Sequence, residues 1–427
     1  MNFRKMPFRI FCVALVAILT LTAAHTLTTR VQARAQMIAF EQWEAETYAS
    51  GSPIGRHEAA MINVDGKFYL MGGRETSMVQ EYDPITRTWT NISNGPADIN
   101  HFQPVEVDGL VYVLGSFNDA FPNDFPDEIP VAEIYIFDPA TGNWSTSPHQ
   151  VPEGRRRGSA GAVVYNGKIY LVGGNELGHN PQFVAWFAEY DPATGNWTIL
   201  PDAPTARDHF NAVVIGDQLI IAGGRQTKLG GNPETFEDVI AEVDVYNFTT
   251  GQWNTLPETS NIPTPRAGAM NVTFGNEVIV VGGETTQGSA HDEVEALDIT
   301  TGQWRTLDNL INGRHSGGTV INSNCIYTVT GSESRAATSG TILDTMERYT
   351  FPTPNTGLNI NITNVDVTVG EAAGTATLEL TFTASDCQNV PSQTISVDYA
   401  TSNGSATAGQ DYTAVNDTLT MQAGENQ

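Results

Sequence analysis

The sequence predicts an all-β protein, in which a six-bladed β-propeller closed by its own N-terminal strand precedes a partial β-sandwich. Three observations predict it. A glycine doublet recurs with a register residue sixteen positions before it, a tryptophan recurs seven positions after a Tyr, Phe or Leu, and the last repeat lacks that tryptophan. Repetition at a fixed spacing indicates equivalent units, which bury their faces by stacking on one another.

The register is the same in all six repeats, without an insertion. The doublets are Gly72-Gly73, Gly173-Gly174, Gly223-Gly224 and Gly282-Gly283, with altered copies at Gly115-Ser116 and Thr330-Gly331. The register positions hold Arg56, Ile99, Arg157, Arg207, Arg266 and Arg314. The sequence therefore predicts six units whose inner halves are equal in length.

Each unit reads as four antiparallel strands. Two apolar, β-branched runs lie between the register residue and the doublet, and Asp-Gly or Asn-Gly joins them in residues 59–73 and 160–174. These dipeptides accept positive φ angles and close two-residue hairpins. After a loop of variable length comes a third strand, and an octapeptide such as YDPATGNW (190–197) turns it into the fourth. Such a sheet is one blade of a propeller.

The tryptophans predict how the blades meet and how the ring closes. They stand at Trp89, Trp144, Trp197, Trp253 and Trp304. We expect them to fill the gaps between neighbouring blades, and the doublets to permit close backbone approach. Repeat six ends after its third strand, and the missing fourth strand is found near the N-terminus, around Trp43. The first strand is therefore predicted to complete the last blade, which removes free sheet edges.

The combination of arginine, Gly-Gly, Tyr-Asp and tryptophan at constant spacing resembles the kelch repeat family. The resemblance covers all six units, over about residues 36–352. It implies a propeller fold. It says little about activity, because propellers of this kind include protein-binding modules and several enzymes.

Residues 1–35 read as a secretory signal peptide. A basic start precedes an apolar run from Ile10 to Ala24, which is short for a membrane span, and small residues follow. An uncleaved N-terminal anchor is the alternative. Removing this segment and its five basic residues leaves 16 basic against 48 acidic residues, a net charge of −32. So acidic a chain repels nucleic acid and anionic lipid. We expect an extracellular or periplasmic monomer that does not insert into the membrane after cleavage.

A short linker at 353–357 leads to a second module at 358–427. The residues Gly370-Glu371, Val397-Asp398-Tyr399, Asp411-Tyr412-Thr413 and Ala423-Gly424-Glu425 resemble a Calx-β domain. That family is a β-sandwich, and two of its strands are missing here, so the module is expected to be truncated. Glu371 matches one calcium-ligand position of the family, but Asn403 stands where calcium-binding members have an acid. Calcium needs six or more oxygens. We therefore expect no cofactor, with calcium at Glu371 as the alternative.

Binding is expected on the face that carries the loops between the second and third strands, here called the variable face. The register residues begin the innermost strands on this face, so they should ring the mouth of the central channel. Four histidines follow register positions by one or two residues. The predicted ligand-binding residues are Arg56, Arg157, Arg207, Arg266, Arg314, His57, His101, His209 and His315.

A ring of arginines would attract a carboxylate, a sugar acid or an acidic peptide loop. The structural alternative is that these arginines pair with acids or carbonyls of a neighbouring blade. Residues one and two positions after the register point to opposite faces of a strand, so at most two of the four histidines would converge. A metal site is not expected from them.

The leading hypothesis is a secreted binding or adhesion module that recognises a protein or glycan, which could be acidic. An enzyme acting on an acidic sugar is the first alternative, because secreted six-bladed kelch proteins include ones resembling sialic acid mutarotases. The candidate acid and base residues are then Glu58, Glu176, Glu284 and His209. A structural component of a surface or matrix is the second alternative. The sequence contains no G-x-S-x-G, H-E-x-x-H or phosphate-loop motif.

Overall fold

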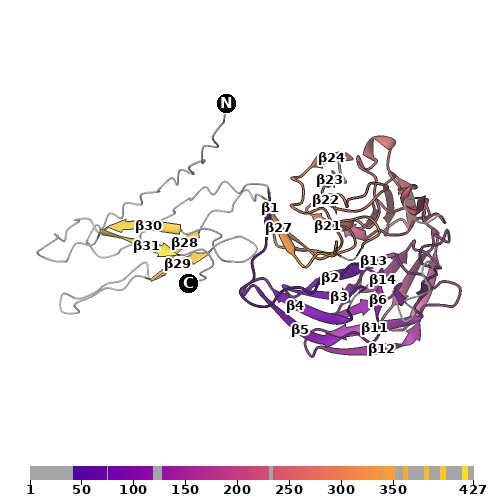
Figure 1. Cartoon of the computed structure of the whole chain (residues 1–427), viewed down its shortest axis with the longest axis horizontal. Coiled ribbons are helices and arrows are strands. Elements are labelled where there is room, and N and C mark those ends of the chain that lie inside the picture. The colour runs from indigo at the N-terminus through magenta and orange to yellow at the C-terminus, as the bar shows by residue number, and fades with distance from the viewer. Residues whose placement is uncertain are drawn as a thin grey trace, which may run out of the picture. The chain divides into compact units, whose positions relative to one another are not determined.

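The computed structural model describes residues 42–351, apart from 75, 119–126, 230–233 and 339, and four short strands beyond them. The chain divides into two compact units, one of which is Phe40–Phe351. Within its described residues, this unit contains six four-stranded antiparallel sheets (Figure 1). The prediction of six four-stranded blades is confirmed.

The blades follow one another along the chain. The first blade is β2–β5 (Ala59–Val64, Lys67–Gly72, Met78–Asp83, Thr88–Asn94). The second is β7, β8, β11 and β12 (Val105–Val107, Leu110–Val113, Glu133–Asp138, Asn143–Gln150). The third is β13–β16 (Gly161–Tyr165, Lys168–Val172, Phe187–Asp191, Asn196–Leu200). The next two are β17–β20 (Ala212–Ile215, Gln218–Ile221, Asp244–Asn247, Gln252–Thr255) and β21–β24 (Met270–Phe274, Glu277–Val281, Val294–Asp298, Gln303–Thr306).

The sixth blade joins the two ends of the propeller. Its strands are β25 (Gly318–Asn322), β26 (Cys325–Val329), β27 (Met346–Thr350) and β1 (Trp43–Ala45). Strand β1 pairs antiparallel with β27, with Trp43 opposite Tyr349, and Figure 1 shows the two strands side by side. The N-terminal strand therefore supplies the missing fourth strand, as the sequence predicts.

Shorter elements lie outside the blades. A three-stranded sheet consists of β6 (Ile99–Asn100), β9 (Phe117–Asn118) and β10 (Ile129–Pro130), and two 3-10 turns are η1 (Glu234–Phe236) and η2 (Glu258–Ser260). In the C-terminal part, β28 (Asn359–Thr363) pairs with β29 (Glu379–Thr383), and β30 (Ile395–Ala400) pairs with β31 (Asn416–Met421). Among the described residues, no helix combines the length and apolarity that a membrane crossing requires.

Tryptophans and glycine doublets connect successive blades. Trp253 and Trp304 donate their indole N–H groups to Pro201 and Ser260, which follow the outermost strand of the preceding blade. At the doublets, the Gly283 N–H donates to the carbonyl of Arg314 in the next blade, at 2.8 Å. A Cβ on Gly282 would lie 2.1 Å from that carbonyl oxygen, so only glycine allows this approach. Both predicted roles are confirmed.

The apolar core lies between the blades. One buried cluster combines the first three strands of blade five with Trp43, Ile326 and Tyr349 of blade six. Another combines blades one and two through Tyr69, Val111 and other residues. Each blade is thus buried on both faces by its neighbours, which explains why a single repeat does not suffice for stability.

The residues two positions after the register form a ring around the channel, which we call the channel ring. They are Glu58, His101, Ser159, His209, Gly268 and Ser316. All six have a left-handed backbone, with φ between 52° and 59°. Each N–H from His101 to Ser316 donates to the carbonyl of the previous member at 2.8–3.1 Å, and Ala59 closes the circle onto Ser316. A left-handed backbone is unfavourable for residues with a Cβ, so the surrounding structure must impose it.

Candidate functional site

The five register arginines do not line the channel mouth. Arg56, Arg157, Arg207, Arg266 and Arg314 are completely buried. Each donates to the carbonyl of the residue sixteen positions later, in its own blade. The prediction that these arginines ring the mouth and contact a ligand is therefore wrong, because their guanidinium groups are hydrogen-bonded within their own blades.

The alternative, that these arginines pair with acids and carbonyls, agrees better with the structure. The partners, however, belong to the same blade and not to a neighbouring one. Arg207 binds Asp244, Arg266 binds Glu295 and Arg314 binds Glu347, at 2.7, 2.5 and 2.5 Å. The partner always stands two residues before the aromatic or leucine residue of the third strand. That fixed offset is a sequence signal that could have identified the arginines as structural.

Two arginines lack an acid at this position. Arg56 donates to the side-chain oxygen of Gln80 at 3.1 Å, and Arg157 has Ala188 at the partner position of its blade. The donors of Arg157 bind only carbonyl oxygens among the described residues, including those of Arg155, Gly173 and Leu171. Burial, with a smaller effect of Arg155, lowers the pKa of Arg157 to about 9.

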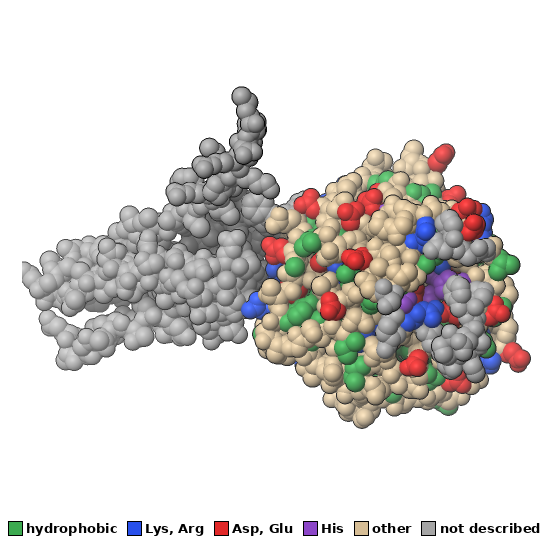
Figure 2. Space-filling view, viewed as in Figure 1, with side chains coloured by type: hydrophobic (Ala, Val, Ile, Leu, Met, Phe, Trp, Pro, Cys, Tyr) green, Lys and Arg blue, Asp and Glu red, His purple; other side chains and the backbone are tan. Residues whose placement is uncertain are grey.

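Polar side chains line the channel at the level of the channel ring. A cavity of about 120 Å³ is lined by the channel ring and by residues at or just before the start of the inner strands, among them Gln103, Asn211 and Asn271. Figure 2 shows histidine and basic side chains together in a hollow of the visible face. The predicted face is thus where polar groups converge.

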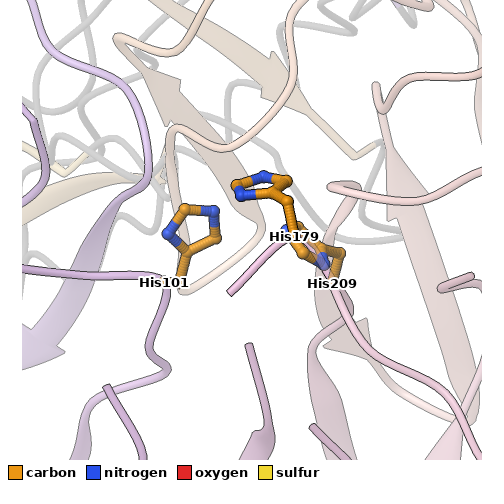
Figure 3. Close-up of side chains that lie close together, drawn as sticks. All are labelled: His101, His179 and His209. Atoms are coloured by element: carbon orange, nitrogen blue, oxygen red, sulfur yellow. The ribbon is translucent and has the colours of Figure 1, made fainter. Parts of the chain in front are cut away.

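Three histidines meet beside this channel. His101 and His209 belong to the channel ring, and His179 comes from the loop between β14 and β15. Their ring centroids are separated by 4.9 Å, 5.3 Å and 5.2 Å, and Figure 3 shows the side chains pointing toward one another. Two of the four predicted histidines therefore converge, as expected from their register positions. The third was missed because it lies in a variable loop.

Carboxylates hold these histidines. Oε2 of Glu58 lies 3.1 Å from Nε2 of His101, Oε2 of Glu128 lies 2.9 Å from Nδ1 of His179, and Oδ1 of Asp208 lies 2.6 Å from Nδ1 of His209.

Burial and neighbouring charges shift the pKa values of these groups in different directions. Burial acts to lower the pKa of His101, but the carboxylates of Glu58 and Glu128 outweigh it and raise that pKa. Burial would raise the pKa of Glu58, but the charge and hydrogen bond of His101 hold it well below its usual value. His209 behaves differently, because burial and the nearby Arg225 lower its pKa to about 4 despite Asp208.

A second group of polar residues adjoins the histidines through Asp208. Nε of Arg225 lies 3.7 Å from Oδ1 of Asp208, and Nη1 of Arg225 lies 2.6 Å from Oε1 of Glu284. The guanidinium groups of Arg225 and Arg335 lie 4.7 Å and 5.8 Å from the ring centroid of Phe236. Nη2 of Arg225 and Nε of Arg335 are buried donors without a hydrogen-bond partner among the described residues.

The remaining predicted residues are placed as follows. His57 and His315 are buried. Nδ1 of His315 forms a hydrogen bond with Oγ of Ser316 at 3.0 Å and lies 3.6 Å from Oε2 of Glu284. Glu176 is half-buried in the β14–β15 loop. Glu371, the calcium candidate, lies outside the described residues.

Sequence reasoning missed the residues that follow the doublets. Arg74, Asn175, Arg225, Glu284 and Ser332 occupy the same repeat position in different blades, and only Glu284 was a candidate. The sequence signal that could have identified these residues is their variation. The side chain at this position differs in chemistry from blade to blade, although the glycines before it hardly change. Variation at one fixed position of a rigid scaffold is typical of a binding surface.

Comparison with known proteins identifies the scaffold. The KLHDC2/KLHL20/DRC7 Kelch-repeats domain matches residues 32–224 and again 162–354, and the Calx-beta domain matches 353–427. Kelch-like protein terF of Aspergillus terreus is 31% identical over 324 residues, which cover 72% of this chain and 67% of that protein. Human Kelch-like protein 23 is 27% identical over 66% of this chain, but the match spans only 46% of the human protein.

A solved structure supports the same architecture. The chain described as "Structure of YjhT" superposes with a TM-score of 0.56 at 18% identity, over 69% of this chain and 95% of that one. At this identity the likeness concerns the fold alone. From its repeats, its six blades and these matches, the chain belongs to the kelch-repeat family and carries a Calx-beta segment after the propeller.

Proposed function

We propose that this chain is a secreted kelch-propeller binding module that recognises a carboxylate-bearing protein segment or glycan at its variable face. The observation that carries the proposal is the pair of buried donors on Arg225 and Arg335, both beside Phe236 and both without a partner among the described residues. An unsatisfied buried donor is costly, and a ligand carboxylate would satisfy it with charge-assisted hydrogen bonds.

The setting favours such a ligand for a second reason. Phe236 is buried beside the two guanidinium groups, so an acid bound by these arginines would lie next to an aromatic ring, a combination suited to a sugar ring or an aliphatic side chain that carries an acid. The cationic site inferred from the sequence is thus retained in this proposal, but with the half-buried Arg335 and the completely buried Arg225 in place of the register arginines.

The test is a binding screen with paired probes. The protein is applied to an array of sialylated and uronic-acid glycans and to a library of acidic peptides, each accompanied by its carboxyl-reduced or amidated counterpart. We expect binding to the acidic member of a pair only. Arg335→Met should weaken that binding at least tenfold, because it removes one of the two guanidinium groups. Since Arg335 is only partly buried, its loss should spare the fold.

Arg305→Met is the matched control, since Arg305 sits on outer strand β24 and pairs with Glu277 on the surface. It should bind like the wild type. Equal binding of acidic and neutralised probes, or equal weakening in both variants, would refute the proposal. The two probe classes decide between a glycan and a protein ligand.

A second candidate is an enzyme acting on an acidic sugar, and the buried Glu58–His101 pair in the channel wall favours it. A carboxylate and an imidazole 3.1 Å apart can exchange a proton with a bound substrate. Proton NMR exchange spectroscopy on N-acetylneuraminic acid and glucuronic acid would detect accelerated interconversion of anomers. The acceleration should disappear in Glu58→Gln; no acceleration in the wild type would remove this candidate.

A further inference from the structure

We propose that His101, His179 and His209 form a site for a divalent transition-metal ion of the zinc class, with one coordination position facing the central channel. The proposal does not rest on the carboxylate-binding function above, because its ligands are the three histidines and not Arg225 and Arg335. It shares His101 with the second candidate function.

The first argument is convergence. One ligating nitrogen from each of the three histidines lies within 4.8 Å of the others. Three imidazoles at this distance are a donor set suited to zinc, copper, iron or nickel. In a tetrahedral zinc site the nitrogens lie about 3.4 Å apart, as follows from metal–nitrogen distances of about 2.0–2.1 Å. The nitrogens must therefore move closer together when an ion binds, and His179 is the ligand that a loop carries.

The second argument is that the opposite side of each imidazole is anchored by an oxygen. Nδ1 lies 2.5 Å from the amide Oδ1 of Asn100 in His101, 2.9 Å from Glu128 Oε2 in His179 and 2.6 Å from Asp208 Oδ1 in His209. In His101 the other nitrogen, Nε2, lies 3.1 Å from Glu58 Oε2, a contact that a bound ion would replace or share. An oxygen acceptor at Nδ1 fixes the tautomer that presents Nε2 to a metal, and carboxylate–histidine pairs such as those of His179 and His209 are the usual support of metal ligands.

The supporting carboxylate of His209 is itself fixed. Asp208 accepts a hydrogen bond from Thr227 Oγ1 at 2.7 Å and another from Asn175 Nδ2 at 2.9 Å. Asp208 is completely buried, and His101 and His209 are almost so. A rigid second layer of this kind lowers the cost of organising the ligands when the ion binds.

The local charge also suits a cation. The carboxylates of Glu58, Glu128 and Asp208 lie against the three histidines, while Arg74 pairs with Glu128 and Arg225 lies near Asp208. Among the described residues, three negative groups therefore face two positive ones when the histidines are neutral. A bound dication would offset this excess of negative charge.

The arrangement leaves room for a fourth ligand. His101 and His209 also line the cavity of about 120 Å³ in the channel. Three protein ligands and one open position are typical of catalytic zinc, whereas structural zinc has four protein ligands. A water molecule or a small oxygen ligand could occupy the position that faces the cavity.

The test uses the full chain after removal of any purification tag and dialysis against a chelator. Zinc or cobalt(II) chloride is added, the unbound ion is removed by gel filtration, and bound metal is measured by mass spectrometry. We expect one ion per chain, a visible absorption band typical of tetrahedral cobalt, and an increase in melting temperature with free zinc.

The variants separate this site from adventitious binding. His179→Ala should abolish the bound ion and the cobalt band, and Asp208→Asn should weaken zinc about 10- to 100-fold through the loss of its support to His209. His149→Ala is the matched control, because His149 is exposed on β12, and it should bind like the wild type. X-ray absorption of the zinc-loaded wild type should show imidazole ligands, a readout that needs no variant.

Two results would overturn the proposal. One is a wild-type chain that retains no ion and shows no tetrahedral cobalt band. The other is an ion retained equally by the wild type and by a folded His179→Ala variant, which would place it elsewhere.

Discussion

Nη2 of Arg207 lies 2.7 Å from Oδ2 of Asp244, and both side chains are completely inaccessible to solvent. The same guanidinium donates to the carbonyls of Gly223 and Glu242. One side chain thus joins the start of the innermost strand to the second and third strands of its blade. This arrangement repeats with small changes in the other arginine-bearing blades, and it explains why arginine recurs at the register position.

Replacing Arg207 by methionine should destabilise the propeller by about 3–5 kcal/mol, because the change leaves the Asp244 carboxylate buried without its countercharge. The measurement is the free energy of unfolding from urea denaturation. Arg305→Met is the control: that side chain is 43% exposed and pairs with Glu277 on the surface, so its loss should cost less than about 1 kcal/mol. Similar costs for the two variants would contradict a structural role for the buried arginine.

The closing strand should be essential to stability. Trp43 is 5% exposed, donates to the carbonyl of Asp308 and packs against Tyr349 at 5.5 Å. Trp43→Ala should lower the free energy of unfolding by about 3–5 kcal/mol, since it opens a cavity and weakens the joint between the two ends of the chain. Ile199→Ala, on an exposed face of β16, should change stability by less than about 0.5 kcal/mol.

The glycine doublet offers a test with a matched glycine. Gly282 and Gly216 both have positive φ, at 61° and 57°, but a Cβ on Gly282 would meet the Arg314 carbonyl whereas one on Gly216 meets nothing within 4 Å. Gly216→Ala should cost about 1–2 kcal/mol from backbone strain alone. Gly282→Ala should cost at least about 2 kcal/mol more, because the next blade must move. Thermal unfolding of both variants would show the difference, and equal losses would argue against the close approach.

Buried tyrosines should make the protein sensitive to alkali. Burial, the largest effect, raises the pKa of Tyr48 to about 12, and burial together with Glu46 and Glu81 raises the pKa of Tyr82 and Tyr69 above the usual range. Above a pH of about 10 the unfolded chain therefore loses protons that the folded chain retains, so the free energy of unfolding falls as the pH rises.

A spectrophotometric titration of tyrosinate checks this expectation. Absorbance should rise in one step together with unfolding in water, and gradually near pH 10 in concentrated urea. Tyr82→Phe should reduce the pH slope of stability above pH 10 by about one proton. Ionisation of all tyrosines near pH 10 in the folded protein would contradict the burial of these hydroxyl groups.

Much of the architecture could be predicted because it depends on local and repeated features. Positive φ angles at Asp-Gly and Asn-Gly, alternation along the strands and the constant sixteen-residue offset all operate within one unit. Six equal units must then stack, and the absence of a tryptophan after residue 349 identified Trp43 as its replacement. These inferences needed only short-range geometry and the requirement that each sheet bury both faces.

The sequence by itself thus determined the six blades, their closure and the face on which polar groups gather. Only the tertiary structure decided that the register arginines point inward to their own blades, because burial depends on which carbonyls and acids the neighbouring strands bring within reach. It also decided that His179 meets His101 and His209. That contact joins a loop of irregular length to two residues of the channel ring, and no periodicity in the sequence specifies where such a loop will lie.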